Sequence, residues 1–296
     1  MNYIKKGIIL LILLIIEFES ALFAQTISGR VVDSKTDQPI SYVNVGIVGK
    51  NMGTVSGLDG DFKFSISGAS DKDTLRFSMI SYVTKDFLIS DIRKSGISES
   101  IKMNEKTIQL QEVIVTNQNA SVIVLGVERK NCYPIPLYKG ASSNLAFPQN
   151  DYRHEIGTRF TNVSPLILDS IQLNLAEANL DRLEFRINVY LIENEIMSNI
   201  LTKPIYISLN KEEAENFPTI DLTMYQIKVN SDFLITIENY KKMAGGSLKI
   251  LANFKSKGEL YPTYYRNNSQ SHWTKLQTSK SKDIGMSLLV FGQSYR

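Results

Sequence analysis

The chain has 296 residues, of which 43% are hydrophobic and 21% charged, and its net charge is +3. This composition excludes a wholly disordered chain and a polycation built for nucleic acid. One cysteine and two histidines also exclude an intrachain disulfide, a CxxC site and a three-histidine zinc site. We therefore expect two globular domains that hold no metal and no other cofactor.

The first 24 residues have the layout of a secretory signal peptide. Lys5 and Lys6 precede an unbroken run of isoleucine and leucine over residues 8–16, and Ala24 offers a small residue for cleavage. The apolar stretch is only about half of the roughly 20 residues that a membrane-spanning helix needs. We expect an exported protein of the periplasm, the outer membrane or the cell surface, with no transmembrane span after signal removal.

Residues 26–116 alternate apolar and polar side chains with a period of two. Strands of roughly five to seven residues at intervals of about ten indicate an antiparallel β-sandwich. The segment Asp59-Gly60-Asp61 is typical of a tight hairpin turn with Gly60 at positive φ. We expect this turn to join the strand through Thr54 to the strand through Phe64.

This first domain resembles the carboxypeptidase regulatory-like, or transthyretin-like, domain. The resemblance is carried by residues 27–33, 38–40, 43–45, 53–54, 59–62, 73–75, Phe77 and 80–82. Ser81 departs from the pattern, because a glycine usually precedes the tyrosine at this turn. The resemblance implies a seven-stranded, Ig-like sandwich of the Bacteroidetes type, a non-catalytic module also found in TonB-dependent receptors of that lineage.

A zinc carboxypeptidase centre does not accompany this domain. Such a centre needs His-x-x-Glu and a distant histidine, but Gly157 stands three places after His154, and His272 is the only other histidine. Four aspartates of the first domain do not follow the order of a helix-loop-helix calcium site either, and turn chemistry accounts for them. These aspartates are Asp59, Asp61, Asp71 and Asp73.

Residues 110–116, Leu-Gln-Glu-Val-Ile-Val-Thr, are similar to the segment that follows this domain in TonB-dependent receptors. We do not expect such a receptor, because the roughly 180 residues after this segment lack the strand series of a large barrel. We interpret residues 110–116 as a closing strand or exit linker, with a coupling role as the alternative. Residues 117–150 contain Pro134 and Pro136 and predict an irregular linker, in which Cys132 is a packing residue rather than a nucleophile.

Residues 151–296 return to the strand pattern. Phe185, Ile187, Val189 and Leu191 make the clearest inward face, and the residues between them are expected to point outward. Roughly eight or nine strands in about 145 residues fit a jelly-roll-type sandwich. The C-terminal segment is similar to jelly-roll modules of secreted proteins, so the whole chain is predicted to be all-β.

Charge is uneven within this second domain. Between Lys241 and Lys282 there are nine basic residues and one acidic residue, whereas residues 169–221 hold ten acidic and four basic residues. An anionic glycan or an acidic envelope protein suits an exported basic surface better than nucleic acid does. The candidate ligand-binding residues are Tyr264, Tyr265, Arg266, His272 and Trp273. The alternative is that these lysines only solvate loops and these aromatic side chains fill the core.

No catalytic residue is assigned, because the chain has no GxSxG motif and two histidines leave little room for a triad. The sequence predicts an exported, non-catalytic binding or scaffolding protein of the cell envelope, of open oligomeric state. One alternative is a carbohydrate-binding accessory protein with Tyr264 and Trp273 as stacking platforms. Another is a hydrolase with a carboxylate pair about 5–10 Å apart in a cleft.

Overall fold

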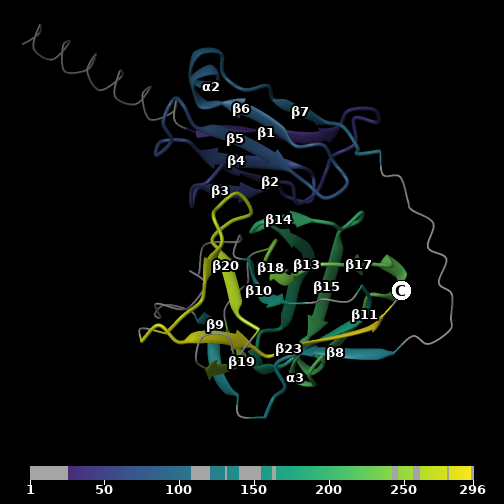
Figure 1. Ribbon diagram of the computed structural model, residues 1–296. Helices are drawn as coiled ribbons and strands as arrows, with labels where there is room; N and C mark the ends of the chain where they lie inside the picture. Colours follow the sequence, from purple (N-terminus) through teal and green to yellow (C-terminus); the bar gives the residue numbers. More distant parts are fainter. Residues whose placement is uncertain are drawn as a thin grey trace, which may run out of the picture. The chain divides into compact units, whose positions relative to one another are not determined.

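The computed structural model divides into two compact units, Met1–Glu105 and Lys106–Arg296 (Figure 1). It describes residues 26–107, 121–130, 132–139, 155–161, 165–241, 246–255, 261–278 and 280–294, apart from the side chains of 137–139 and 255. The predicted signal peptide and residues 110–116 lie outside the described residues. No helix in the described part of the chain is long and apolar enough to cross a membrane.

The first unit contains two sheets, as the alternating pattern predicts. One sheet has the order β4 (Asp61–Ser65), β1 (Thr26–Asp33), β7 (Ser100–Met103), and the other has the order β3 (Gly53–Val55), β2 (Asn44–Ile47), β5 (Thr74–Ser78), β6 (Lys85–Leu88). Phe62 of β4 and Phe77 of β5 meet edge to face with ring centroids 5.1 Å apart. This aromatic contact joins the two sheets through the buried core.

The prediction for Gly60 is confirmed in its backbone conformation and wrong in its connectivity. Gly60 has φ +75°, and a Cβ there would lie 2.4 Å from the carbonyl oxygen of Val31. The turn does not close a hairpin, because β3 pairs with β2 and β4 pairs with β1. It therefore carries the chain from one sheet to the other.

The first unit also has a short helix that the strand pattern did not predict. Helix α2 (Ile89–Ser95) follows β6 directly and buries Ile89 and Ile92. The backbone amide of Ile89 donates to the carbonyl of Asp73, 3.0 Å away. The seven-residue helix spans about two turns and buries two apolar residues three positions apart, which is too short for a periodic signal in the sequence.

The second unit contains three sheets. A seven-stranded sheet has the order β14 (Ile196–Asn199), β13 (Arg182–Glu193), β18 (Phe233–Glu238), β10 (Glu155–Phe160), β20 (Thr263–Arg266), β21 (Thr274–Lys275), with β15 (Ile205–Asn210) also on β13. A five-stranded sheet has the order β16 (Thr219–Asp221), β11 (Leu166–Leu173), β23 (Leu288–Ser294), β8 (Val122–Gly126), with β17 (Lys228–Val229) on β11. In the four-stranded sheet, β19 (Ser247–Lys255) pairs with β12 (Leu175–Asn179), β22 (Asp283–Met286) and β9 (Tyr133–Lys139).

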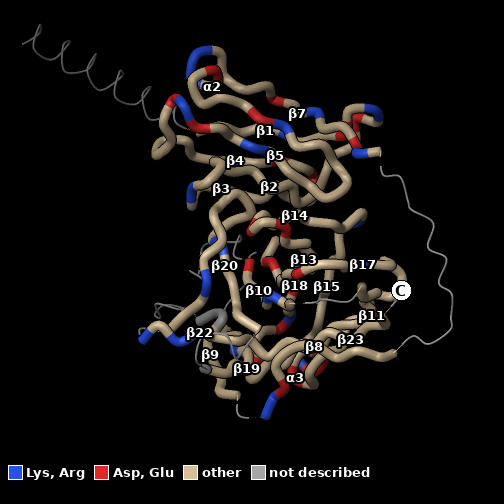
Figure 2. The backbone as a smooth tube through the Cα atoms, in the orientation of Figure 1, with Lys and Arg blue, Asp and Glu red and all other residues tan. Residues whose placement is uncertain are grey.

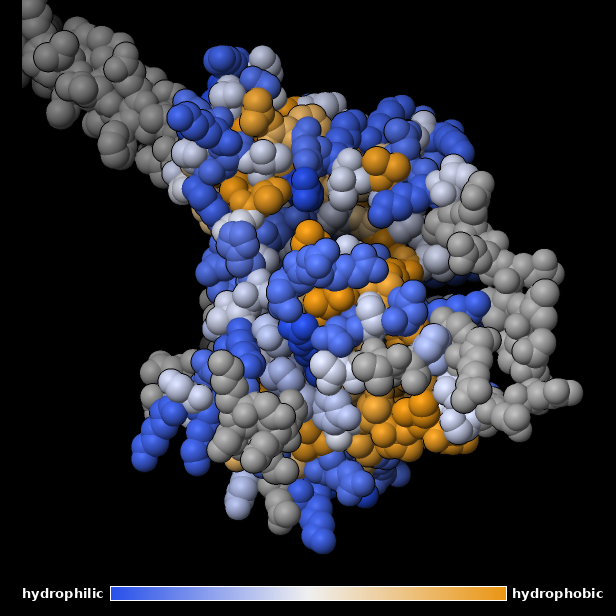
Figure 3. Space-filling view, viewed as in Figure 1, coloured by the Kyte–Doolittle hydropathy of each residue, from blue (hydrophilic) through white to orange (hydrophobic). Residues whose placement is uncertain are grey.

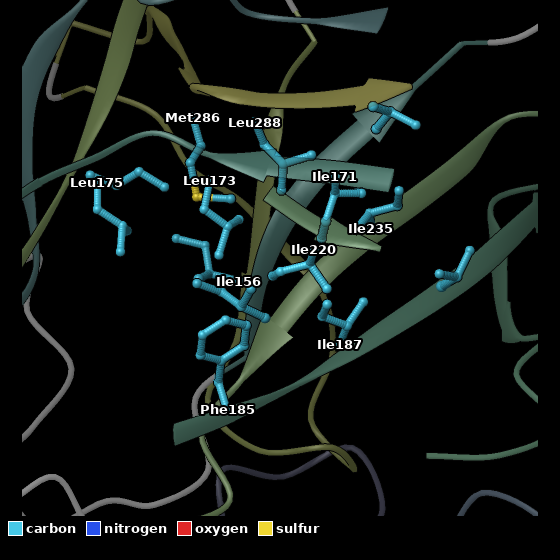
Figure 4. Packing of buried hydrophobic residues seen from close by; sticks show 14 of the residues in the cluster. Ile156, Ile171, Leu173, Leu175, Phe185, Ile187, Ile220, Ile235, Met286 and Leu288 are labelled. Atoms are coloured by element: carbon cyan, nitrogen blue, oxygen red, sulfur yellow. The ribbon is translucent and has the colours of Figure 1, made fainter. Parts of the chain in front are cut away.

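One large hydrophobic core lies between these sheets. Phe185 and Ile187 of β13 are buried there together with Ile235, Ile171 and Leu288 from three other strands (Figure 4). The predicted inward face of β13 is therefore confirmed. Helix α3 (Lys211–Glu215) and the 3₁₀ turn η1 (Thr223–Tyr225) are the described helical segments of this unit.

Two strands of the second unit come from the predicted linker. β8 pairs with β23, and β9 pairs with β19, so the second unit includes residues that the sequence assigned to an irregular connection. β9 contains Pro134 and Pro136, and proline is tolerated at the edge of a sheet, where its missing N–H is not needed. The all-β prediction is confirmed, while sheets of seven, five and four strands exceed an eight-stranded jelly roll.

Candidate functional site

Four charged residues form a continuous row across the seven-stranded sheet. Arg186 of β13 is opposite Glu238 of β18, Glu238 is opposite Glu155 of β10, and Glu155 is opposite Arg266 of β20. The side chains project from the sheet face that is turned away from the large core, because Phe185 and Ile187 take the core side of β13. We call these four residues the charged row. In Figure 2 acidic and basic residues lie close together among β10, β13 and β18.

Each arginine of the charged row binds one carboxylate through two nitrogens. Arg186 Nε and Nη2 donate to Glu238 over 2.6 and 2.7 Å. Arg266 Nε and Nη2 donate to Glu155 Oε2 over 2.7 and 2.6 Å. The Glu155 side chain is fully buried and that of Arg266 is 11% exposed. Within each pair the arginine therefore neutralises its glutamate away from water.

Neutral side chains complete the coordination of both carboxylates. Asn188 Nδ2 donates to Glu155 Oε1 over 2.8 Å and to Glu238 Oε2 over 2.7 Å. The hydroxyls of Tyr190 and Thr236 also donate to Glu155 Oε1. Every carboxylate oxygen of the charged row therefore accepts at least one hydrogen bond from the protein itself.

The protonation states of the charged row follow from these contacts. Burial by itself would raise the pKa of Glu238, but the Arg186 guanidinium outweighs burial and holds that pKa below its ordinary value. Burial raises the pKa of Tyr190 well above the ordinary value. At neutral pH Glu238 is thus ionised and the Tyr190 phenol is protonated.

The connection between β20 and β21 lies over one end of the charged row. Arg266 Nη1 donates to the carbonyl of Ser269 over 2.7 Å. The Arg266 guanidinium carbon lies 4.3 Å from the Trp273 ring centroid and 5.4 Å from that of Tyr190. Because Trp273 and Tyr190 also meet edge to face at 5.5 Å, Arg266 anchors this loop to the sheet through a hydrogen bond and cation–π contacts.

The structure brings together some of the predicted ligand-binding residues and separates one. Tyr264, Arg266 and Trp273 lie on the same side of the sheet, with Tyr264 and Trp273 packed against a small cluster around Tyr190. Tyr265 lies on the opposite side and packs against the large core. His272 is exposed in the loop, and Trp273 is half-buried.

Sequence reasoning missed most of the charged row. It placed Arg186 and Asn188 on an outward face, but both are buried. Glu155 lies 111 residues from Arg266 along the chain, so no local spacing connects them. The available signal was the run of polar residues Arg186, Asn188 and Tyr190 on one face of a long, otherwise apolar strand.

Most of the described lysines and arginines between Lys241 and Lys282, which we call the basic segment, form ion pairs. Its ion pairs outside the charged row are Lys241–Glu184, Lys249–Glu177 and Lys275–Asp283. Two of these carboxylates come from the acidic segment 169–221, so the two oppositely charged segments pair with each other in the fold. The lysines Lys280 and Lys282 remain exposed.

The motif residues of the first unit have structural contacts. Asp33 Oδ1 accepts from the backbone amides of Lys35 and Thr36, both at 2.9 Å, and these bonds lower the pKa of Asp33. The Tyr82 hydroxyl binds the same carboxylate. Ser81 has φ +73°, which explains why glycine suits this turn.

Three of the four aspartates considered for calcium bind cationic side chains instead. Asp61 pairs with Arg30, Asp71 with Arg93 and Asp73 with Lys50. Among the described residues there is no group of three or more histidine, cysteine or acidic side chains placed to share a metal ion.

The fold and these contacts define an all-β protein with a β-sandwich module at its N-terminal end. Residues 27–115 match the model of the CarboxypepD_reg-like domain family, which confirms the resemblance for that part of the chain. No curated protein matches the chain.

Solved structures similar to the chain include those of the T13 particle of infectious bursal disease virus and of the Gx and Gt strains of that virus. They are 10, 9 and 10% identical, cover 92, 91 and 91% of this chain, and have a TM-score of 0.20. The chain spans 62, 65 and 64% of those chains. A TM-score of 0.20 is too low to indicate a shared fold.

Proposed function

We propose that the protein is an exported, non-catalytic binding or scaffolding protein of the cell envelope. The observation that carries this proposal is the saturation of Glu155 and Glu238 by hydrogen-bond donors of the protein itself. The CarboxypepD_reg-like match of the first unit supports the same conclusion, because it suggests a binding module rather than an enzyme.

The charged row argues against the hydrolase alternative. Glu155 and Glu238 are neighbours that share the Asn188 amide, as a carboxylate pair of a glycosidase could be. A glycosidase, however, needs one carboxyl group free to donate a proton and the other free to reach the substrate or a water. Both carboxylates here are buried and bound by arginine, so we assign the pair to holding the sheet together.

The loop between β20 and β21 is the binding surface that we propose. His272 is exposed at this loop, and Trp273 beside it is half-buried, while Arg266 holds the loop backbone through Ser269. A loop held in one conformation loses less entropy when it binds a ligand. Trp273 contacts Arg266 and Tyr190 but keeps part of its ring exposed, and an exposed aromatic ring can pack against a sugar, which supports carbohydrate binding as the second candidate function.

Trp273 is the only tryptophan of the chain, so intrinsic fluorescence of the full-length protein tests this loop directly. We would titrate the protein with acidic and neutral glycans at low and high salt. Binding at the loop should change the fluorescence of the wild type, and His272→Ala should weaken the binding. Met224→Ala, at an 80% exposed site on η1, is the matched control and should bind as the wild type does.

The same titration separates two origins of affinity. A salt-resistant signal indicates stacking on Trp273, and a salt-sensitive signal indicates attraction by surface lysines. No fluorescence response of the wild type to any of these glycans would contradict binding at this loop, and a response that His272→Ala leaves unchanged would show that His272 is not a contact. Hydrolysis of a glycoside, ester or peptide substrate that Glu238→Gln abolishes without unfolding the protein would overturn the non-catalytic proposal.

Export is tested separately. N-terminal sequencing of the protein from its native cell envelope should show cleavage at or near Ala24. An intact Met1 on the envelope-bound protein would contradict the signal peptide.

A further inference from the structure

The five-stranded sheet of the second unit has apolar side chains on both faces. Leu168, Ile171 and Val290 point into the large core. The alternate positions point away from it, and register places Val124 of β8 opposite Phe291 of β23. The outer apolar face, as we call it, consists of Val122, Val124, Ile167, Leu289 and Phe291.

Solvent reaches the outer apolar face in the second unit. Val122 is 75% exposed and Val124 is 53% exposed. Ile167, Leu289 and Phe291 are partly exposed and belong to none of the described hydrophobic clusters. Figure 3 shows hydrophobic surface over this region of β8 and β23. Contiguous apolar patches of this kind mark contact sites in soluble proteins.

β8 is the terminal strand of the five-stranded sheet in the described part of the chain. Among the described strands it pairs only with β23. The strand Val122–Gly126 contains no proline and no charged residue, whereas the edge strand β9 carries Pro134 and Pro136. Edge strands of monomeric proteins are usually blocked by charge, proline or a bulge, and β8 has none of these in its sequence.

The charges around the outer apolar face restrict what can cover it. Near β8 its polar neighbours are Gln172 and Gln293. The charges lie at the other side of the sheet, where Lys228 is opposite Ile167, Asp221 is opposite Ser170, and Asp169 is bound by Gln293 over 3.1 Å. Mixed charges of this kind do not form the cluster of basic residues that binds an anionic lipid surface. A two-fold contact places like groups close together, and β8, which carries no charge, can make that contact without repulsion.

We propose that the outer apolar face is the contact between two copies of this chain. β8 of one copy pairs antiparallel with β8 of the other, which extends the five-stranded sheet across the two-fold axis. In the register centred on Val124, this residue meets its own copy and Val122 meets Gly126. The inference does not depend on the proposed ligand loop, which belongs to the seven-stranded sheet.

Analytical ultracentrifugation of the full-length protein over a concentration series tests the proposal. The wild type should show a monomer–dimer equilibrium. Val124→Lys brings two ammonium groups together at the axis and should raise the dimer dissociation constant by about tenfold or more. Val124→Thr keeps a β-branched side chain and should dimerise more strongly than Val124→Lys.

Met224→Lys is the matched control, because it adds the same charge at an exposed apolar residue of η1, which connects β16 and β17 at the sheet edge opposite β8. It should dimerise as the wild type does. A wild type that stays monomeric throughout, or a dimer that Val124→Lys leaves intact, would overturn the proposal. Thermal melting of each variant shows whether the monomer remains folded, and the Trp273 titration reports separately on the ligand loop.

Discussion

Replacing Glu155 with glutamine should destabilise the second unit strongly. Glu155 is fully buried and accepts hydrogen bonds from Asn188, Tyr190, Thr236 and Arg266. A glutamine has the same shape but carries an NH₂ group in place of one carboxylate oxygen. Whichever way the amide is turned, this NH₂ faces other donors, and the Arg266 guanidinium loses its counter-charge.

Removing one partner of a buried ion pair costs about 3–5 kcal/mol, because the other charge remains buried without compensation. We expect Glu155→Gln to lower the free energy of unfolding of the second unit by that amount. Such a loss is a large share of the roughly 5–15 kcal/mol that stabilises an ordinary domain. Arg266→Met should cost a similar amount for the same reason.

The assay is urea denaturation followed by Trp273 fluorescence, which reports on the second unit because the chain has no other tryptophan. Glu195→Gln is the matched control, since Glu195 also binds an arginine through two oxygens but is 72% exposed. It should cost less than about 1 kcal/mol. In the double variant Glu155→Gln/Arg266→Met no unpaired charge of this pair remains, so the two changes should couple by about 1–3 kcal/mol. Equal costs for Glu155→Gln and Glu195→Gln would refute the reasoning.

Three further predictions follow from single residues. Gly60→Val should destabilise the first unit by about 1–3 kcal/mol, because the backbone has positive φ and the new Cβ would meet the Val31 carbonyl; an unchanged urea transition of the first unit, followed by circular dichroism, would contradict this. The pKa of Glu238 is lowered in the fold, so the ionised Glu238 stabilises the protein above the ordinary pKa of glutamate, and this stabilisation is lost as the pH falls below about 4. The urea midpoint should therefore decrease between neutral and acidic pH, and it should decrease less steeply in Glu238→Gln. Burial raises the pKa of the Cys132 thiol and outweighs a hydrogen bond with Ser287 that lowers it. Iodoacetamide should therefore alkylate the folded protein more slowly than a cysteine peptide at pH 8. An equal rate would contradict the raised pKa.

The sequence by itself determined the properties that depend on neighbouring residues. A period of two along β4, β5 and β13 predicted strands and identified the residues that face each core. The glycine between two aspartates predicted positive φ at Gly60 for the same local reason. The CarboxypepD_reg-like resemblance also came from short motifs, and Asp33 and Tyr82 of those motifs meet at one turn.

Elements without a clear local signal were missed. β8 and β9 lie in a region with prolines and little alternation, and they form strands because β23 and β19 offer them partners. Local turn chemistry predicts a hairpin at Gly60, but it does not say which strands will pair. Strand pairing is a long-range property, so it cannot be obtained from a window of ten residues.

Only the tertiary structure decided the chemistry of the candidate site. Alternation along β13 showed that Arg186 and Asn188 share a face, but whether water or protein covers that face depends on strands far away in the chain. Folding placed Glu155 beside Arg266 and paired Lys249 of the basic segment with Glu177 of the acidic one. A charge imbalance within a segment thus says little about the surface, because electrostatic partners are set by distance in space, and the sheet order determines that distance.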